Sequence, residues 1–110
     1  MGLPVVYRQA ARREIVAAAR EHETLRRGLG VSFLDEIARI EAHLSEAPRL
    51  YQHVVDDVRR AVLRRFPFGL FYLEEDRRIL VLACLDLRRS SGDLRHRRQA
   101  MTSPPGMGLA

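Results

Sequence analysis

The sequence predicts one α+β domain, in which an N-terminal strand and a two-helix hairpin pack on a small, mainly antiparallel sheet in the order β-α-α-β-β-β. Three observations predict this class. A length of 110 residues allows one two-layer core and excludes two domains. Apolar residues recur at three- and four-residue steps in the first half and in strand-length runs in the second. Shares of 46% hydrophobic and 30% charged residues exclude a disordered or fibrous chain.

The first element is a short strand, followed by an amphipathic helix. Residues 3–7 are apolar and β-branched, which favours a strand. Over 9–27, the apolar and small side chains recur with helical spacing. They are Ala11, Ile15, Ala18, Ala19, His22 and Leu25. The segment 28–30 supplies the glycine expected just past a helix end.

A second helix, predicted over 32–45, completes the hairpin. Its apolar stripe consists of Phe33, Ile37, Ile40 and Leu44. Asp35 and Glu36 supply the acidic first turn that complements the helix dipole. The helix is expected to stop before Pro48, because the position before a proline disfavours helix.

The second half predicts three consecutive strands after an irregular connection. The connection spans 48–57, and the strands are predicted over 58–64, 66–73 and 78–87. An acidic turn at 74–77 separates the last two strands at hairpin spacing. The three strands therefore form a meander.

The last strand and the C-terminal region differ in composition. The run 79–85 does not alternate, so this strand is expected to be central or covered on both faces. Cys84 lies inside the run and is expected to be a small buried hydrophobe. A short helix or turn is predicted at 90–98, which completes a domain at 1–98, and the uncharged segment 99–110 is predicted to be a disordered tail.

Several classes of protein are excluded by residues that the sequence lacks. No apolar run approaches the ~20 residues that span a bilayer, and residues 1–6 do not form a secretion signal. We therefore expect a cytoplasmic protein with no membrane partner. One cysteine excludes a disulfide-stapled fold. No metal or cofactor is expected, because no histidine has partners at metal-site spacing, and His22 is expected to pack in the core.

Charge is distributed unevenly along the chain. All 19 basic residues are arginine. Residues 1–57 carry a net charge of −1, whereas residues 58–98 carry +6. An excess of this kind favours a negatively charged partner, either a nucleic acid or an acidic protein segment.

The order of elements and several strings of residues resemble the RelE/ParE superfamily of type II toxins, often labelled plasmid-stabilisation proteins. The resemblance covers about 5–98. It rests on the 28–30 linker with Phe33 after it, the stretch 58–72 with its Arg-Arg-Phe-Pro-aromatic string, the run 79–85, and Arg88-Arg89. It implies a toxin that a cognate antitoxin neutralises in a heteromeric complex. RelE-like members cut mRNA on the ribosome without a metal, and ParE-like members poison DNA gyrase.

Compared with the RelE-like pattern, the residues that cleave RNA are incompletely matched. Arg60 and Arg89 fall on two basic positions of that pattern. Gly69 stands where the middle strand would carry a catalytic arginine, Arg95 where a C-terminal tyrosine is expected, and Val62 where another basic residue is expected. The groups needed for acid and base catalysis are therefore incomplete.

The ParE-like branch matches better, because an arginine pair follows the last strand, as Arg88-Arg89 does here. Members of that branch often carry histidine two residues before the pair and Asp-Pro after it, whereas this chain has Asp86 and Ser90-Ser91. The favoured interpretation is a ParE-like toxin that binds DNA gyrase. The alternatives are a RelE-like, ribosome-dependent mRNA endoribonuclease that uses Arg60, Arg64 and Arg89, and an inactive remnant that still binds antitoxin.

Five residues are candidates for binding the antitoxin or the target. Arg60 and Arg64 are expected on one face of their strand, because side chains alternate along a strand. The alternative for them is charge that protects an exposed edge strand from aggregation. Arg88 and Arg89 end the last strand, where side chains can meet a groove. Tyr72 is expected to keep its hydroxyl at the rim, whereas the other aromatic residues of the strands are expected in the core.

Overall fold

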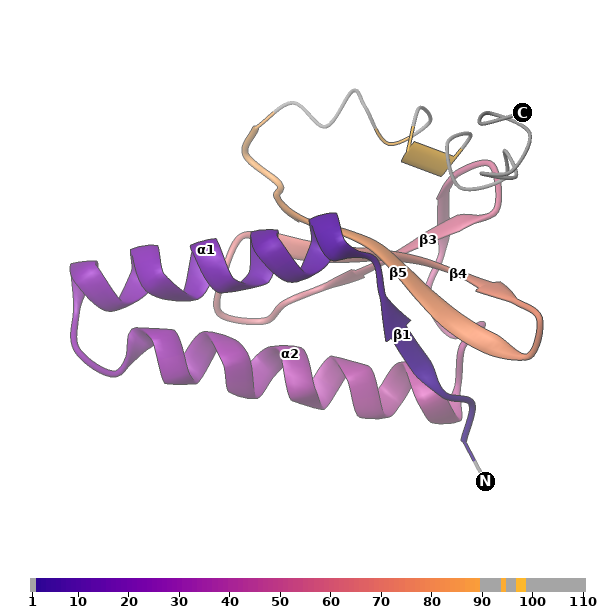
Figure 1. Ribbon diagram of the computed structural model, residues 1–110, viewed down its shortest axis with the longest axis horizontal. Coiled ribbons are helices and arrows are strands. Elements are labelled where there is room, and N and C mark those ends of the chain that lie inside the picture. Colours follow the sequence, from indigo (N-terminus) through magenta and orange to yellow (C-terminus); the bar gives the residue numbers. More distant parts are fainter. Residues whose placement is uncertain (1, 90–93, 95–96, 99–110) are drawn as a thin grey trace.

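The computed structural model describes residues 2–89, 94, 97 and 98. These residues form β1 (Val5–Tyr7), α1 (Gln9–Leu25), α2 (Leu29–Glu46), β2 (His53–Val55), β3 (Val58–Val62), β4 (Phe68–Glu75) and β5 (Arg78–Asp86). The strands form one sheet in the order β1-β5-β4-β3-β2 (Figure 1). β1 is parallel to β5, and the other neighbouring pairs are antiparallel. The predicted α+β class is confirmed.

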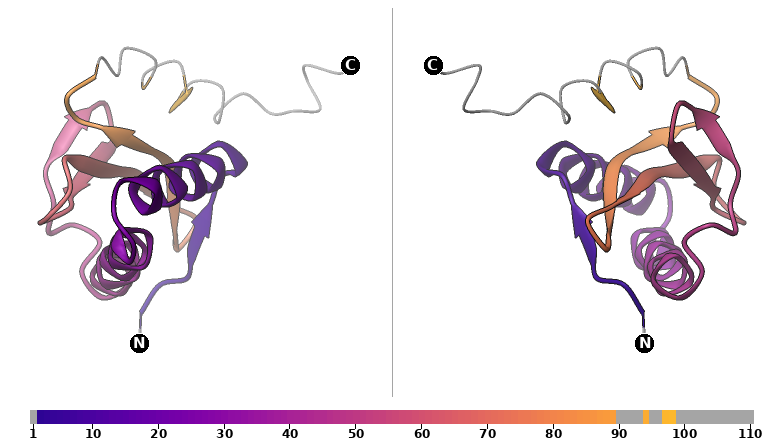
Figure 2. Two further views of the ribbon diagram at one scale, coloured as in Figure 1. Left: turned by 90° about the vertical axis from the view of Figure 1, so that its left-hand side faces the viewer. Right: turned by 90° about the vertical axis from the view of Figure 1, so that its right-hand side faces the viewer.

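The helical hairpin covers one face of the sheet, which we call the inner face (Figure 2). The core between the helices and this face includes Ile15, Ala18, Phe33, Ile37, Ile40, Leu44, Leu70, Tyr72, Ile79 and Val81. A smaller cluster lies on the opposite, outer face. It consists of Val58, Phe71, Leu73, Leu80, Leu82, Ala83 and Leu94. β5 contributes to both clusters and lies between β1 and β4, which confirms that the last strand is central and covered on both faces.

Two local features shape the hairpin of β4 and β5. Asp76 and Arg77 adopt φ angles of 53° and 62°, the left-handed conformation that a two-residue hairpin turn requires. Further along, Phe71 pairs with Ala83 and Tyr72 pairs with Val81, so β5 contains one extra residue between these pairs. This bulge places Leu82 and Ala83 together in the outer cluster.

Three of the differences from the predicted elements have a clear local cause. The segment 48–57 contains the short strand β2, because Asp56 takes a φ of 49° and closes a tight turn to β3. β3 ends at Val62 rather than at 64, because the backbone N–H group of Arg64 donates to Glu36 of α2 and not to a neighbouring strand. α2 begins at Leu29, because Gly28 adopts a φ of 92° as its N-cap, and Asp35 and Glu36 consequently lie beyond its first turn.

The predicted helix or turn at 90–98 lies outside the described residues, except for Leu94, Arg97 and Arg98. The predicted tail at 99–110 lies wholly outside them. Neither helix of the described part is long and apolar enough to cross a membrane.

Candidate functional site

The candidate site is a corner of the sheet, where Gly69 of β4 lies between β3 and β5. A Cβ atom added to Gly69 would lie 3.2 Å from Arg60 Cγ and 3.3 Å from Leu87 Cδ2. Glycine therefore leaves room for the stem of Arg60 and the side chain of Leu87 to meet over β4. The arginine pair follows Leu87 directly. We call Arg60, Asp86, Arg88 and Arg89 the basic corner.

Asp86 holds the arginine pair at the end of β5. Its Oδ1 accepts hydrogen bonds from the Arg88 backbone N–H at 2.9 Å and from Arg88 Nε at 3.1 Å, and its Oδ2 accepts one from Arg88 Nη2 at 2.9 Å. Arg89 Nε lies 3.8 Å from Asp86 Oδ2. The hydrogen bonds from Arg88 lower the pKa of Asp86 to about 2, so the carboxylate is charged at neutral pH.

Both arginines of the pair stay accessible although Asp86 orients them. The Arg88 side chain is 71% exposed and the Arg89 side chain is 76% exposed. Free donor positions on each guanidinium can therefore bind a carboxylate or phosphate of a partner. Asp86, which stands where ParE-like chains often carry histidine, orients this pair.

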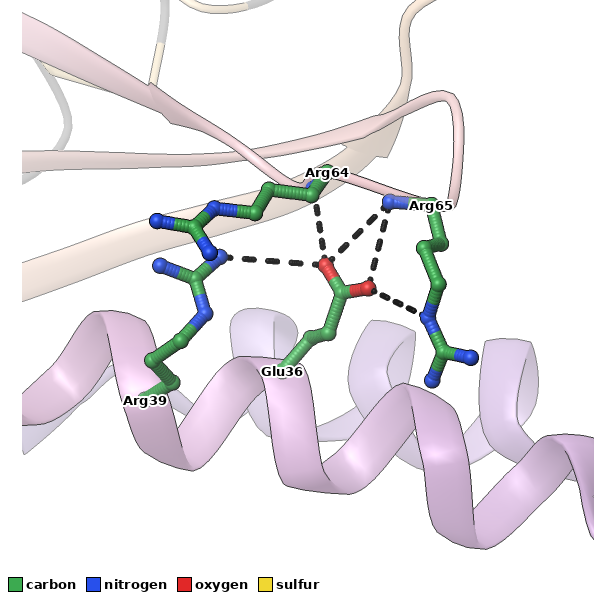
Figure 3. A network of polar contacts seen from close by, with 4 residues as sticks. All are labelled: Glu36, Arg39, Arg64 and Arg65. Carbon is green, nitrogen blue, oxygen red and sulfur yellow. Dashed lines mark hydrogen bonds and ion pairs between the residues drawn. The ribbon is translucent and has the colours of Figure 1, made fainter.

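Arg64 and Arg65 belong to a different network, centred on Glu36 of α2 (Figure 3). Glu36 Oε1 accepts a hydrogen bond from the Arg64 backbone N–H at 2.7 Å, and Oε2 accepts bonds from the Arg65 backbone N–H and Nε, both at 3.1 Å. Arg39 Nη2 lies 3.9 Å from Oε1. Burial opposes ionisation of Glu36, but these hydrogen bonds outweigh it and lower its pKa.

The Glu36 network changes what can be expected of Arg64. β3 has ended before this residue, so the strand alternation that would align Arg64 with Arg60 does not reach it. Its backbone amide is turned to α2 rather than to a neighbouring strand. The structure therefore does not bring Arg64 into the basic corner, although its side chain is exposed.

Tyr72 is fully buried on the inner face, so the expectation that its hydroxyl lies at the rim is wrong. The hydroxyl donates a hydrogen bond of 2.7 Å to the carbonyl oxygen of Pro48. On the neighbouring strand, Arg59 Nη1 donates to the carbonyl oxygen of Tyr51 at 2.5 Å. Because β3 and β4 pair here, both side chains hold the connection between α2 and β2.

His22 packs among aromatic rings, as predicted. Its ring stacks on Phe33 with centroids 5.3 Å apart and meets the edges of Phe66 and Phe68 at 4.9 and 5.5 Å. Its Nδ1 lies 2.7 Å from the carbonyl oxygen of Ala18. The two phenylalanines of the strand region are buried as well, so they offer no stacking surface to nucleic-acid bases.

A groove of about 390 Å³ opens beside the basic corner, between α1 and the end of β5. Asp86 and Arg89 line it from the sheet side, and Glu14 and Glu21 line it from α1. Cys84 lies at its base with 2% exposure, and burial raises the pKa of its thiol to about 12. Side chains of both signs line the groove, which favours a mixed polar peptide over a polyanion.

The basic corner can bind an anion, and two tyrosine hydroxyls elsewhere in the domain keep their protons at neutral pH. Burial raises the pKa of Tyr72 to about 12, and burial together with the hydrogen bond to Glu41 raises the pKa of Tyr7 above its ordinary value. Arg95, the expected counterpart of a catalytic tyrosine, lies outside the described residues. Within the described ranges, no three metal-ligating side chains come together.

Comparison with known proteins gives a match at the level of fold. No protein-family model matches the chain, and no curated protein matches it. Among solved structures, it is similar to a chain of the "Chromosomal ParDE TA system from P. aeruginosa", with a TM-score of 0.69 and 16% sequence identity. The match covers 77% of this chain and 96% of that chain. At this identity, the likeness shows a shared fold.

Two residues that organise the site region escaped the sequence analysis. Glu36 lies within the apolar stripe of α2, three residues after Phe33 and one before Ile37, and a charged residue at such a position signals a buried partner. Glu14 accepts a hydrogen bond from the Cys84 backbone N–H at 3.0 Å. No local pattern in the sequence distinguishes Glu14 from a solvated helix residue.

Proposed function

We propose that this chain is the toxin component of a type II toxin-antitoxin system, of the ParE-like, plasmid-stabilisation kind. It inhibits growth by binding a cellular target, with DNA gyrase favoured. A cognate antitoxin neutralises it in a heteromeric, cytoplasmic complex. The observation that carries the proposal is the fold shared with a chain of a ParDE structure over 96% of that chain.

The basic corner supports action by binding. Arg88 and Arg89 are exposed, and Asp86 orients them, so their ordering entropy is partly lost before a partner arrives. Arg60 is exposed on the outer face of the sheet, with its stem over Gly69. These three arginines are the proposed contacts with the antitoxin or the target.

The alternative, a RelE-like endoribonuclease, has less support in the geometry. Arg60 and Leu87 fill the space over Gly69, where that pattern would place a further arginine. Of the arginines that the alternative would use, Arg64 lies apart from the basic corner in the Glu36 network. The alternative and the inactive remnant are therefore outcomes of the test rather than the proposal.

The test is to induce the full chain alone in a bacterial host and to follow labelled precursors of DNA and protein over the first minutes. An early fall in DNA synthesis, together with inhibition of gyrase supercoiling by the purified protein, is the expected result. An earlier fall in protein synthesis would favour the endoribonuclease. If neither falls, the chain is not an active toxin in that host.

A pair of double variants tests the basic corner in the same experiment. Arg88→Ala with Arg89→Ala should abolish the inhibition, because two accessible cationic contacts are lost. Arg26→Ala with Arg27→Ala removes an equally exposed arginine pair between the helices and should leave the inhibition intact. Circular dichroism checks that both variants fold. If both double variants inhibit to the same degree, Arg88 and Arg89 are not specific contacts with the target.

A further inference from the structure

A second groove, of about 550 Å³, lies away from the basic corner, where β1 leads into α1. Its apolar lining comes from Val6, Leu80 and Leu82. Val6 and Leu80 are register partners in the parallel pair of β1 and β5, and Leu82 lies further along β5 on the same outer face. This floor is formed by two paired strands, so it is already in place before a ligand binds.

Three arginines line the same groove, and no acid does so among the described residues. Arg97 is held by Glu14, with guanidinium to carboxylate distances of 3.0 and 2.7 Å. Arg8 and Arg78 line the groove from the start of α1 and the start of β5. Within the described part of the chain, neither of these two forms an ion pair.

Arg78 carries the observation that points to a ligand. Its Nε is buried and has no hydrogen-bond acceptor among the described residues. A buried donor on a charged group that lacks an acceptor destabilises the fold, because its lost hydration is not replaced. Arg78 also lines the open groove, so a small rotation of its side chain would bring this donor to an acceptor that enters the groove.

The start of α1 adds to the positive potential of the groove. Arg8 is the N-cap and makes no side-chain cap, and the first turn contains no acidic residue. Gln9 and Ala10, the first residues of the helix, line the groove. Helix starts usually carry a capping oxygen or an acid, because the end of the helix dipole is positive. Here arginines surround it instead, which lowers stability unless an anion binds.

We infer that this groove binds a nucleoside phosphate, with its phosphate at Arg8, Arg78 and the start of α1, and its base on Val6, Leu80 and Leu82. Donors from two arginines and a helix start approach from different directions, which suits a tetrahedral phosphate better than a planar carboxylate. An apolar floor suits the face of a base better than the hydroxyl groups of a sugar phosphate. The groove volume is in the range of sites for such ligands.

The test titrates the full chain with ADP, inorganic pyrophosphate, adenosine and succinate, and follows the backbone amide resonances. ADP should shift the resonances of Val6, Gln9, Arg78 and Leu80 at the lowest concentration, pyrophosphate should shift those of Gln9 and Arg78 only, and adenosine and succinate should bind weakest. Binding of succinate as tight as that of ADP would overturn the assignment of phosphate. Binding of pyrophosphate as tight as that of ADP would overturn the role of the apolar floor.

Neighbouring arginines provide the matched variants. Arg78→Gln should weaken ADP binding by about tenfold or more, since a charge-assisted contact is lost. Arg77→Gln removes the same charge from the exposed adjacent turn position and should leave the affinity unchanged. Thermal unfolding checks that both variants fold. Equal weakening in both variants would show attraction by net charge alone. Tighter binding of a single-stranded oligonucleotide through the same residues would replace the small ligand with a nucleic acid.

Discussion

Glu36 is the buried charged residue of the described core, with 7% exposure. It fixes the connection from β3 to β4 against α2 through the amides of Arg64 and Arg65. Without this acceptor, two partly buried N–H groups would lose their hydrogen bonds, and the side chain of Arg65 would lose its ion pair. One residue thereby sets where β3 ends and keeps Arg64 out of the basic corner.

Replacing Glu36 tests this role at the residue scale. Glu36→Ala should lower the free energy of unfolding by about 2 kcal/mol or more, because its donors are left unsatisfied. Asp35→Ala removes an exposed acid from the next position of the helix and should change it by less than about 0.5 kcal/mol. Urea unfolding followed by circular dichroism measures both. A loss in Glu36→Ala no larger than that in Asp35→Ala would contradict the role.

The lowered pKa of Glu36 adds a pH dependence to the same prediction. Its pKa is lower in the folded state than the ordinary 4.5, so the folded state favours the charged form. The stabilisation is therefore complete above pH 4.5 and is lost as the pH falls through the folded-state pKa. In the Glu36→Gln variant, the free energy of unfolding should fall less steeply as the pH is lowered below 4.5. Urea unfolding at several pH values measures this. If the variant and the parent lose stability equally steeply below pH 4.5, other carboxylates cause the loss of stability in acid.

At the scale of elements, the helical hairpin depends on two glycines with different tasks. Gly28 has a φ of 92° and open space around its missing Cβ, so it is needed for its backbone conformation. Gly30 has an ordinary helical backbone, but a Cβ there would lie 2.8 Å from the Ala19 carbonyl oxygen of α1. Gly30 is therefore the point of close approach between the helices. The backbone N–H groups of both glycines also donate hydrogen bonds to the Glu23 carboxylate.

Gly30→Ala distinguishes close approach from helix propensity. Alanine in a helix ordinarily stabilises by up to about 1 kcal/mol relative to glycine. Here the added methyl group must push α1 and α2 apart, so we expect a net loss of about 1–3 kcal/mol in the free energy of unfolding. Thermal and urea unfolding measure it. A variant as stable as the parent would show that the helices separate at no cost.

At the scale of the whole molecule, three described residues after β5, Leu94, Arg97 and Arg98, connect distant elements. Leu94 packs in the outer cluster with 8% exposure. Arg97 binds Glu14 of α1, and Arg98 binds Asp57 of the β2–β3 turn at 2.6 and 2.8 Å. The chain thereby joins the first helix to the far edge of the sheet.

Leu94→Ala tests whether this covering stabilises the whole domain. Loss of a buried leucine side chain should lower the free energy of unfolding by about 2 kcal/mol. Leu25→Ala, at a leucine that is 72% exposed, should change it by less than about 0.5 kcal/mol. A chain that ends at Arg98 keeps all of these contacts and should melt at the parent's temperature. Urea unfolding and calorimetry measure the three proteins, and equal stability of both leucine variants would exclude the covering role.

Much of the fold could be predicted because its signals are local. The period of the apolar residues in α1 and α2 and the continuous run in β5 identify element type and burial without knowledge of the partners. The predicted boundaries were wrong where a single residue takes a left-handed conformation, as at Asp56 and Gly28. Several residue types adopt this conformation, so the residue type alone does not predict it. Those two positions account for the missed β2 and the early start of α2.

The sequence alone determined the order of elements, the helical hairpin, the doubly covered β5 and the concentration of arginine in residues 58–98, because periodicity and charge are properties of neighbouring residues. The tertiary structure decided which arginines stand together. Asp86 orients Arg88 and Arg89. Glu36 binds the backbone N–H groups of Arg64 and Arg65, and Tyr72 is buried on the inner face. Each of these outcomes depends on a hydrogen-bond partner or a packing neighbour supplied by the folded chain, and strand alternation by itself does not specify that partner.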